Sequence, residues 1–358
     1  MNSTKITRLQ KAFDLEYPDR PPILGGWLAS PEHIWTITGC SPDDYWDKPF
    51  YWGLEAERKL GSDGVVTIFE PISRGTYRCV DGQVLAERNA YTVDSMLAYM
   101  AALPEPESLV ADFDEENAYS DFLSKYKSKQ AQCGELLWCP ADWELIPTAL
   151  WSLKFGYETA FITMAQYPDQ YRKLIQYSAE RGRLKARLIA RAIREGYHPR
   201  ALMTGEDICS QRGPMVSPKY LRREYFPLVE YALEPLFEAG AKIVWHCDGD
   251  VRPILEDILS CGIGGLQGFQ RECGMDLHWI ADLKTREGDP LLIFGPISVT
   301  KTLPFGTPED VQAEVKTAMD LCRDKASLVF FTSNTINPDV PLENIYALWN
   351  TVQESKWQ

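Results

Sequence analysis

Short apolar runs alternate with longer amphipathic segments along most of the chain. The runs are rich in Val, Ile, Leu and Phe, end in turn residues and are too short for helices, so each predicts a buried strand. Eight such runs occur, at 22–27, 64–69, 135–140, 201–207, 242–248, 265–270, 291–296 and 327–333. Eight strands that alternate with helices predict a closed parallel β-barrel.

The segments between these runs have helical spacing of apolar positions. The first places Ile6, Leu9 and Phe13 on one face and predicts a leading helix that ends before the prolines that follow. Further helical patterns lie at 50–61, 148–194, 217–241, 251–262, 276–288, 307–322 and 341–355. Several of them open with a capping residue, namely Ser217, Asp276 and Thr307.

These elements predict an α/β fold in which residues 1–358 form a single (β/α)8 TIM barrel. Two features interrupt the alternation after the second strand. Around the Asp81-Gly82 turn, residues 75–90 have the pattern of a β-hairpin on the barrel rim. A polar helical insertion follows at about 104–134. We found no repeat, low-complexity tract or linker that divides the chain.

Composition and charge narrow the class of protein. Hydrophobic residues make up 45% of the chain and charged residues 25%, which is typical of a folded domain. The 51 acidic residues outnumber the 37 basic ones and give a net charge of -14, which argues against binding to nucleic acid or an anionic membrane surface. No run of about 18 apolar residues occurs. The sequence therefore predicts a protein outside the membrane.

The first residues and the cysteines indicate a compartment. The start MNSTKITRLQ lacks the apolar core of a signal peptide. Nine cysteines are scattered without a C-x-x-C pair, which suits free thiols in a reducing environment. We therefore expect a cytoplasmic location.

Polar side chains gather where several predicted strands end, which is where barrel enzymes place their working residues. The strand ends are Gly205-Glu206-Asp207, His246-Cys247-Asp248, Gln267 to Gln270 and Ser333-Asn334-Thr335. Side chains alternate along a strand, so His246 and Asp248 should face the same side. They can form a metal pair or an acid/base pair, which Glu206 or Asp207 would complete. The alternative is a hydrogen-bonded structural histidine, with Asp248 capping the next turn.

Other residues are candidates for substrate binding. Trp27 opens an aromatic-rich stretch that lines either a flat apolar pocket or the core; its other members are Trp35, Tyr45, Trp46, Tyr51 and Trp52. Glu70 is either a cleft carboxylate or an exposed loop residue. Gln270, Ser333 and Asn334 also lie at strand ends.

One short motif has two interpretations. Asp276-Leu277-His278 is similar to the D-x-H signature with which a histidine binds cobalt in cobalamin-binding domains, but Ala281 replaces the glycine of that signature. The simpler interpretation is an aspartate that caps the start of a helix.

Long parts of the chain resemble the uroporphyrinogen decarboxylase superfamily. The similar segments run from GEDICSQRGP through KIVWHCDGD to GLQGFQ (205–270), and include GPISVTKTLPFGTPEDVQAEV (295–315), SNTINPDVPLENI (333–345) and the opening PDRPP (18–22). The resemblance implies a single (β/α)8 barrel with its active cleft at the C-terminal ends of the strands. It also implies a homodimer, which is common in that superfamily.

The chain departs from true uroporphyrinogen decarboxylases at the positions that hold the substrate. Those enzymes carry R-Q-A-G-R after the first strand, an aspartate after the second and a histidine near the eighth. Here the first loop reads GGWLASPEH, Glu70 follows the second strand, and Asn334 stands near the position of the histidine. Buried carboxylates need cationic partners, so a substrate with eight carboxylates is a poor fit.

The resemblance extends to a second branch, the corrinoid-dependent methyltransferases. Its coenzyme M enzymes bind zinc through His-x-Cys at the fifth strand and a distant Cys near the eighth. In this chain His246 matches the histidine, Asp248 occupies the cysteine position, and Ser333 stands near the third ligand. An oxygen-rich site made of His246, Asp248 and Glu206 or Asp207 would instead hold zinc or another divalent metal.

The sequence therefore favours an enzyme that moves a methyl group between a small O- or N-methyl compound and the cobalt of a separate corrinoid protein. The first alternative is a cofactor-free decarboxylase acting on a porphyrinogen-like or other carboxylated substrate. The second is a ligand-binding barrel without catalysis.

Overall fold

A computed structural model describes residues 4–70, 79–80, 83–84 and 91–357. Each of the eight predicted apolar runs contains a strand. These strands are β1 Leu24–Gly25, β2 Gly64–Val65, β5 Leu137–Trp138, β6 Ala201–Gly205, β9 Lys242–His246, β10 Gly265–Gln267, β11 Leu292–Ile297 and β12 Ser327–Thr332. All of them pair in parallel, as β1-β2-β5 and as β6-β9-β10-β11-β12.

Two parallel bridges join these sheets into one ring. Ile23 bridges to Phe330 and connects β1 with β12, while Ala141 bridges to Met203 and connects the end of β5 with β6. The backbone N–H of Phe330 donates to Pro22 at 2.8 Å, and that of Asp142 donates to Met203 at 2.8 Å. The ring confirms the predicted α/β barrel, in which consecutive strands lie side by side.

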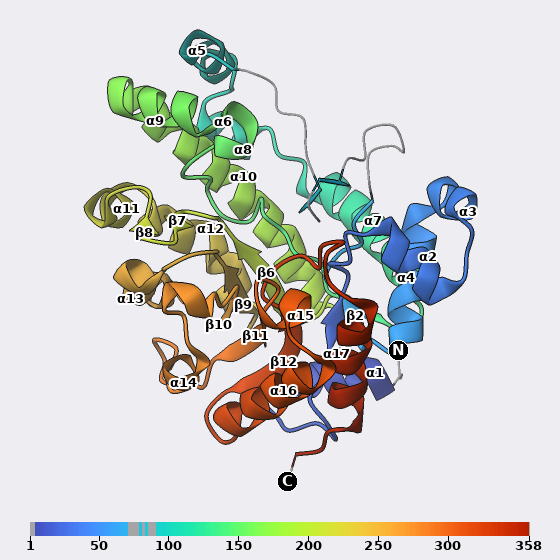
Figure 1. Ribbon diagram of the computed structural model, residues 1–358. Helices are drawn as coiled ribbons and strands as arrows, with labels where there is room; N and C mark the ends of the chain where they lie inside the picture. Colours follow the sequence, from blue (N-terminus) through green and yellow to red (C-terminus); the bar gives the residue numbers. More distant parts are fainter. Residues whose placement is uncertain (1–3, 71–78, 81–82, 85–90, 358) are drawn as a thin grey trace.

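Helices surround the ring (Figure 1). They are α1 Thr4–Phe13, α2 Pro31–Thr38, α3 Pro42–Asp47, α4 Pro49–Leu60, α5 Val93–Ala101, α6 Pro106–Ala111, α7 Glu115–Cys133, α8 Ser152–Phe155, α9 Tyr157–Gln166, α10 Pro168–Arg194, α11 Pro218–Glu224, α12 Phe226–Glu238, α13 Leu255–Ser260, α14 Leu277–Ile280, α15 Thr302–Phe305, α16 Pro308–Cys322 and α17 Leu342–Glu354. Two short 3-10 helices, η1 Arg252–Ile254 and η2 Arg271–Cys273, and a hairpin of β7 Cys209–Ser210 with β8 Gly213–Pro214 lie in the loops. The described helices include none that is long and apolar enough to cross a bilayer.

Three predicted helical stretches are shorter or more divided than expected. Residues 148–194 form α8, α9 and α10, because Gly156 adopts a left-handed φ of 80° and Pro168 has no N–H to continue a helix. The 217–241 stretch divides into α11 and α12 at Tyr225, just before Pro227. In 276–288 only α14 is helical. Prolines and a glycine end these helices without altering the spacing of the apolar residues. Periodicity alone therefore predicted longer helices than the structure has.

The predicted hairpin and insertion lie between β2 and β5. β3 Cys79–Val80 pairs with β4 Gln83–Val84 in antiparallel register, as expected of a hairpin. Of the predicted hairpin at 75–90, the structure describes only these two strands. The Asp81-Gly82 turn and the other residues of this range lie outside the described residues. α6 and α7 occupy the predicted 104–134 insertion.

The interior of the ring is filled by apolar side chains, and α1 closes its N-terminal end. Strand residues such as Val244, Phe294 and Phe331 are almost completely buried in one cluster with Leu9 and Phe13 of α1. The rings of Phe13 and Phe294 lie 6.0 Å apart. The barrel is therefore a packed core rather than a channel, and its functional groups must lie at the opposite end.

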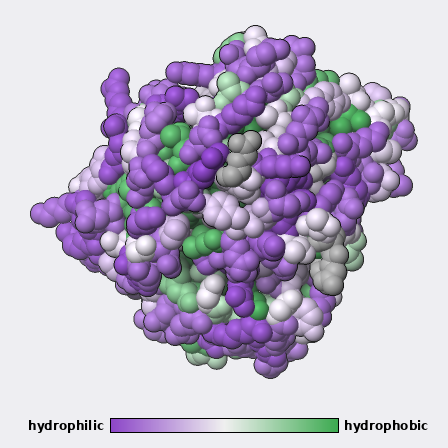
Figure 2. Space-filling view, turned by 90° about the horizontal axis from the view of Figure 1, so that it is seen from below, coloured by the Kyte–Doolittle hydropathy of each residue, from purple (hydrophilic) through white to green (hydrophobic). Residues whose placement is uncertain are grey.

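The surface has a different character from this core. Figure 2 shows a face on which hydrophilic residues predominate and hydrophobic ones form separate patches. Such scattered patches are normal on a surface that faces water.

A buried ion-pair network ties the opening segment to the barrel. Asp63, immediately before β2, is fully buried and contacts Arg8 of α1 as well as Arg20, whose Nη1 lies 2.8 Å from Asp63 Oδ2. The backbone N–H of Ile23 also donates to Asp63 Oδ2 at 2.9 Å. Arg8 in turn pairs with Asp19 at 2.7 Å. The PDRPP segment thus supplies charged groups that hold β1, β2 and α1 together.

We predict that Asp63→Ala lowers the free energy of unfolding by about 3–5 kcal/mol, because it leaves two enclosed guanidinium groups without their partner. Urea denaturation measures this loss. Asp169→Ala, which removes an exposed partner of Arg172, is the matched control and should cost less than about 1 kcal/mol. Equal losses in the two variants would contradict the structural role of Asp63.

Candidate functional site

Three predicted side chains meet at the C-terminal ends of β6 and β9. Gly205 of β6 is in register with His246 of β9, and Asp207 and Asp248 each follow two residues after these positions. One ligand atom from each of Asp207, His246 and Asp248 lies within 4.8 Å of the others. We call these three residues the triad.

The imidazole of His246 is held in one orientation. Its Nδ1 is hydrogen-bonded to Oε1 of Gln267, the residue in register with it on β10. The amide of Gln267 cannot turn over, because its Nε2 donates to the carbonyls of Thr332 and Ser333 at 2.8 and 3.1 Å. Gln267 Oε1 must therefore accept from the Nδ1–H of His246, which directs His246 Nε2 toward the other two members of the triad. There it lies 3.4 Å from Asp207 Oδ1.

Asp248 is fixed in a similar way. Asn334 Nδ2 donates to Asp248 Oδ2 at 2.6 Å, and the orientation of the Asn334 amide is set by the Thr335 N–H, which donates to its Oδ1 at 2.6 Å. The backbone N–H of Asp248 donates to Asp207 Oδ1 at 3.0 Å. Asp248 Oδ1 is buried and has no hydrogen-bond partner among the described residues. A buried acceptor without a donor is costly, so this oxygen is open to a cation or to a proton-bearing ligand.

The charges of the triad depend on one another. Burial lowers the pKa of His246, but the hydrogen bond and negative charge of Asp207 outweigh burial and raise it to about 9. Burial raises the pKa of Asp207, and its contact with His246 more than compensates, so the net pKa is lowered. Burial and the charge of Asp207 raise the pKa of Asp248 to about 6, against the opposing effect of His246. At neutral pH the metal-free site is an imidazolium held by two carboxylates.

Glu206 lies beside the triad without joining it. Its two carboxylate oxygens accept from the backbone N–H groups of Ala149 and Leu150 at 2.7 and 2.8 Å. Loss of solvent around this carboxylate raises its pKa to about 7 despite these hydrogen bonds. The sequence proposed Glu206 or Asp207 as the third member; the structure brings Asp207 into the group and uses Glu206 to hold the segment before α8.

The remaining predicted residues have mixed positions. Gln270 Oε1 accepts from the Gly249 N–H at 2.8 Å and supports the loop after β9. Ser333 is buried and its Oγ accepts from the Val299 N–H at 3.2 Å. Glu70 is exposed at the end of a described segment. These three residues support or surround the strand ends, whereas Asn334 contacts the triad directly.

Two tryptophans cover His246. Trp27, from the loop after β1, lies edge-on to the imidazole with 5.7 Å between ring centroids. Trp143, from the loop after β5, does the same at 5.4 Å and is 44% exposed. The other predicted aromatics pack among α2, α3 and α4, as in the Trp35–Tyr45 and Tyr45–Trp46 contacts. The aromatic stretch is therefore mainly packing, and Trp27 alone reaches the triad.

Sequence reasoning missed the roles of Gln267 and Trp143. A signal for Gln267 existed, because an amide in an apolar strand must satisfy its hydrogen bonds inside the barrel. No such signal marks Trp143, which lies in an irregular loop.

The D-x-H segment is a helix cap. The Asp276 carboxylate accepts from the backbone N–H of His278 at 3.0 Å at the start of α14 and also contacts His278 Nδ1 at 2.8 Å. The simpler interpretation of this motif is confirmed.

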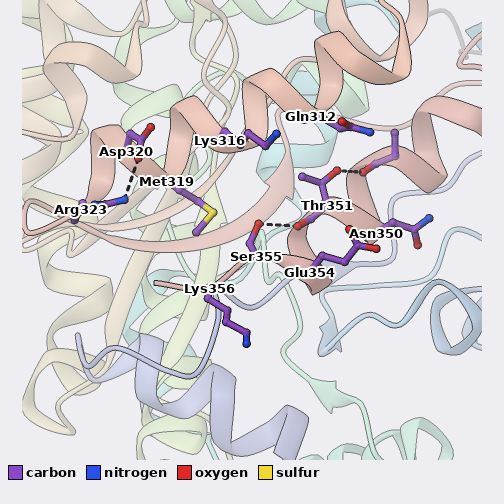
Figure 3. A pocket seen from close by; sticks show the side chains of 11 residues that line it. Gln312, Lys316, Met319, Asp320, Arg323, Asn350, Thr351, Glu354, Ser355 and Lys356 are labelled. Carbon is purple, nitrogen blue, oxygen red and sulfur yellow. Dashed lines mark hydrogen bonds and ion pairs between the residues drawn. The ribbon is translucent and has the colours of Figure 1, made fainter. Parts of the chain in front are cut away.

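A cavity of about 240 Å³ lies next to the triad, between the loop after β5, α8, the start of α9 and the end of β6. A larger cavity of about 720 Å³ lies between α16 and α17 (Figure 3). Two of the polar groups in its lining are bonded within it: Arg323 pairs with Asp320 at 3.0 Å, and Ser355 Oγ donates to the backbone carbonyl of Thr351 at 2.6 Å. It contains no strand-end residue, so the smaller cavity is the better candidate for chemistry.

The triad fits a divalent metal ion. It offers one imidazole nitrogen and two carboxylates, and within the described part of the chain Asp248 Oδ1 has no hydrogen-bond partner. Cys247 does not take part, since its Sγ donates to the Asp248 carbonyl at 3.2 Å. A nitrogen- and oxygen-rich set is compatible with zinc or a harder cation and differs from a thiolate zinc site.

We predict that in the metal-free protein Asp207→Asn lowers the pKa of His246 below about 9, because burial is then opposed only by the charge of Asp248 and the hydrogen bond to Gln267. The raised pKa stabilises the fold fully below pH 6.5, and this contribution is lost as the pH rises through about 9. This loss of stability should be smaller in the variant and should begin at a lower pH. NMR titration of the imidazole and urea denaturation between pH 6 and 10 measure both effects.

The matched control is Asp276→Asn, which alters an exposed Asp–His pair and should leave the His246 titration unchanged. A His246 pKa that stays near 9 in Asp207→Asn would contradict the assigned pairing.

Comparisons with known proteins identify the family and agree with the fold. A family model described as uroporphyrinogen decarboxylase (URO-D) matches residues 148–355. A comparison with curated proteins gives no match. Among solved structures, a methyltransferase from Methanosarcina mazei is similar in fold, with a TM-score of 0.62 and 16% identity over 99% of each chain. Since the family match spans more than half of its length, the chain belongs to the uroporphyrinogen decarboxylase (URO-D) family.

Proposed function

We propose that this protein transfers a methyl group from a small methylated compound to the cobalt of a separate corrinoid protein. The observation that carries the proposal is the Asp207–His246–Asp248 triad at the strand ends of a URO-D barrel, beside a small cavity. The imidazolium of His246, or a cation held by the triad, can stabilise negative charge on a leaving atom, which methyl transfer from oxygen requires. The fold shared with a methyltransferase supports the same branch of the family.

The charge of the cavity argues against uroporphyrinogen as the substrate. The described residues that line it include Glu206 and Asp207 but neither lysine nor arginine. A polycarboxylate would therefore be buried against like charges without a cationic partner. Its volume of about 240 Å³ is also below the roughly 300–1,000 Å³ of pockets for drug-sized ligands, and a tetrapyrrole is larger still.

A divalent metal would be held by His246 Nε2, Asp248 Oδ1 and the Asp207 carboxylate. Such an ion acts as a Lewis acid on the oxygen from which the methyl group departs. Gln267 keeps Nε2 directed at this position, and Asn334 keeps Asp248 Oδ1 free for it. His246 must lose its Nε2 proton before a metal binds there, so metal binding and protonation of His246 exclude each other.

Without a metal the same residues supply a proton instead. The imidazolium of His246, stabilised by Asp207, is an acid located at the mouth of the barrel. It can protonate the departing oxygen. When His246 takes up a new proton, the carboxylate of Asp207 stabilises the positive charge that the imidazole regains. Trp27 and Trp143 limit the access of water to the imidazole.

The corrinoid protein would dock over the strand ends. Apolar side chains are exposed in the loops there: Leu153 of α8 is 92% exposed and Phe305 of α15 is 80% exposed. Exposed apolar residues around a site are typical of a surface that binds another protein. We expect the methyltransferase itself to be a homodimer in the cytoplasm.

We predict that the chain, mixed with a reduced corrinoid protein and a methyl donor, methylates cobalt in a reaction that visible absorption follows. Asp248→Asn should reduce kcat about 100-fold, because a metal that stabilises the leaving oxygen would lose one of its ligands. Asp47→Asn, at an exposed position of α3, should retain wild-type activity. Carbon dioxide release from a carboxylated substrate, without cobalt methylation, would instead favour the decarboxylase alternative.

The metal hypothesis predicts one equivalent of zinc or another divalent ion per chain, detected by elemental analysis and by competition with a chromophoric chelator. His246→Ala should abolish binding. Gln267→Leu should weaken it about 10- to 100-fold through loss of the acceptor for Nδ1–H. Affinity should rise with pH up to about 9, because His246 has to be deprotonated.

Glu206→Gln tests whether Asp207, rather than Glu206, is the third ligand. The Glu206 carboxylate accepts from backbone N–H groups, so its replacement should leave metal binding intact. Full methyl-transfer activity of a metal-free protein would exclude the metal and leave the protonated His246 as the acid.

A further inference from the structure

A third cavity, of about 270 Å³, lies at the end of the barrel opposite the triad. Its lining comes from the segments that follow α1, α16 and α17 and from the residues at the start of β11 and β12, namely Leu15 to Pro18, Pro290, Asp324 to Leu328 and Trp357. The helices of a (β/α)8 barrel run back along its strands, so helix C-termini meet here beside strand N-termini. None of these residues belongs to the site at the strand C-termini.

The charges around this cavity favour a cation. A helix C-terminus carries a partial negative charge of about half an elementary unit, and neither α16 nor α17 has a basic residue in its last turn. Glu16 and Asp324 of the lining have no ion-pair partner within the described residues. Lys325 pairs with Asp282 at 2.8 Å, and the nearby Lys284 donates to the Lys325 carbonyl at 3.3 Å. Together these groups leave an excess of negative charge at the cavity.

Two aromatic rings form a corner beside these carboxylates. The rings of Tyr17 and Trp357 lie 5.2 Å apart, and their planes meet at 74°. The phenol of Tyr17 is held in place by Asp324, whose backbone N–H donates to its oxygen at 2.7 Å and whose Oδ1 accepts from it at 3.3 Å. The faces of such rings attract ammonium groups through the ring quadrupole, and their carbon atoms pack against apolar groups. The corner can therefore bind both parts of an organic cation.

The backbone of this lining has two unusual residues. Leu15 and Asp324 adopt left-handed φ values of 62° and 58°, and they are two of the three non-glycine residues with such values in the described part of the chain. For leucine this conformation costs about 1–2 kcal/mol, and strain of this kind concentrates at ligand sites. The two residues turn the chain after α1 and after α16, which brings Tyr17 into contact with Asp324.

The cation that fits is organic rather than a metal ion. Among the described residues, only the triad forms a group that could hold a metal. The other walls of this cavity are apolar, and a hydrated ion would lose water there without gaining oxygen ligands; they come from Leu15, Pro18, Pro290, Ala326 and Leu328. A ligand that combines one ammonium group with a small apolar body matches both the charge and the walls.

We propose that this cavity is a second binding site, which takes a small organic ammonium ion. The charged group lies against Glu16 and Asp324, and the apolar body lies against Tyr17 and Trp357. The site is at the far end of the barrel from the triad, so the inference does not depend on the proposed methyl transfer.

Calorimetric titration of the full chain with four probes tests the proposal. The probes are 2-phenylethylammonium, 2-phenylethanol as its uncharged isostere, 3-phenylpropionate as its anionic counterpart, and methylammonium, which lacks the apolar body. The first should bind about tenfold more tightly than each of the others. Glu16→Gln should weaken it about threefold and Trp357→Ala about tenfold, because one removes a carboxylate and the other a wall of the corner.

Matched control variants keep the test specific. Glu309→Gln removes an exposed carboxylate at the opposite end of α16, and Tyr346→Ala removes an exposed ring of α17 outside the cavity; both should leave binding unchanged. Asp207→Asn should also leave it unchanged, because the acidic cavity beside the triad is a separate place where a cation could bind.

Two kinds of result would overturn the proposal. Equal or tighter binding of any of the other three probes would contradict the ligand class. Binding that survives both Glu16→Gln and Trp357→Ala, or that is lost in Asp207→Asn, would contradict the location of the site.

Discussion

Closure of eight parallel strands into one ring is the constraint on which the rest of this structure depends. Parallel pairing aligns all C-terminal ends at one end of the barrel, and the register sets Gly205, His246 and Gln267 side by side. Residues that are more than 20 positions apart in the sequence therefore lie within a few ångströms of each other. The buried network around Asp63 and the packing of α1 stabilise the opposite end, which separates stability from chemistry.

Three neighbouring carboxylates at the strand ends have different roles because their partners differ. Backbone amides hold Glu206, the imidazole of His246 holds Asp207, and Asn334 holds one oxygen of Asp248. The partners are themselves fixed by carbonyls and N–H groups of the barrel loops. One oxygen of Asp248 has no partner among the described residues, and His246 and Asp207 line a cavity with aromatic walls. That combination supports the proposed methyl transfer.

Features that depend on neighbouring residues in the sequence were predicted correctly, whereas features that depend on contacts between distant segments were not. All eight strands lie within the predicted runs, because burial on both faces leaves a continuous apolar record. Strand alternation also placed His246 and Asp248 correctly at one strand end. The helices at 148–194 were overestimated, since Gly156 and Pro168 act on the backbone without disturbing the apolar spacing. Gln267 and Trp143 were missed because their contacts with His246 come from other strands and loops.

The sequence by itself determined the barrel, the family resemblance and the set of polar strand ends, because these depend on local periodicity and on residue identity. Only the tertiary structure decided which carboxylate completes the triad. Glu206 and Asp207 are adjacent and chemically alike, and their side chains leave the backbone in different directions. Glu206 meets the amides of Ala149 and Leu150, while Asp207 meets His246, and no local pattern encodes that distinction.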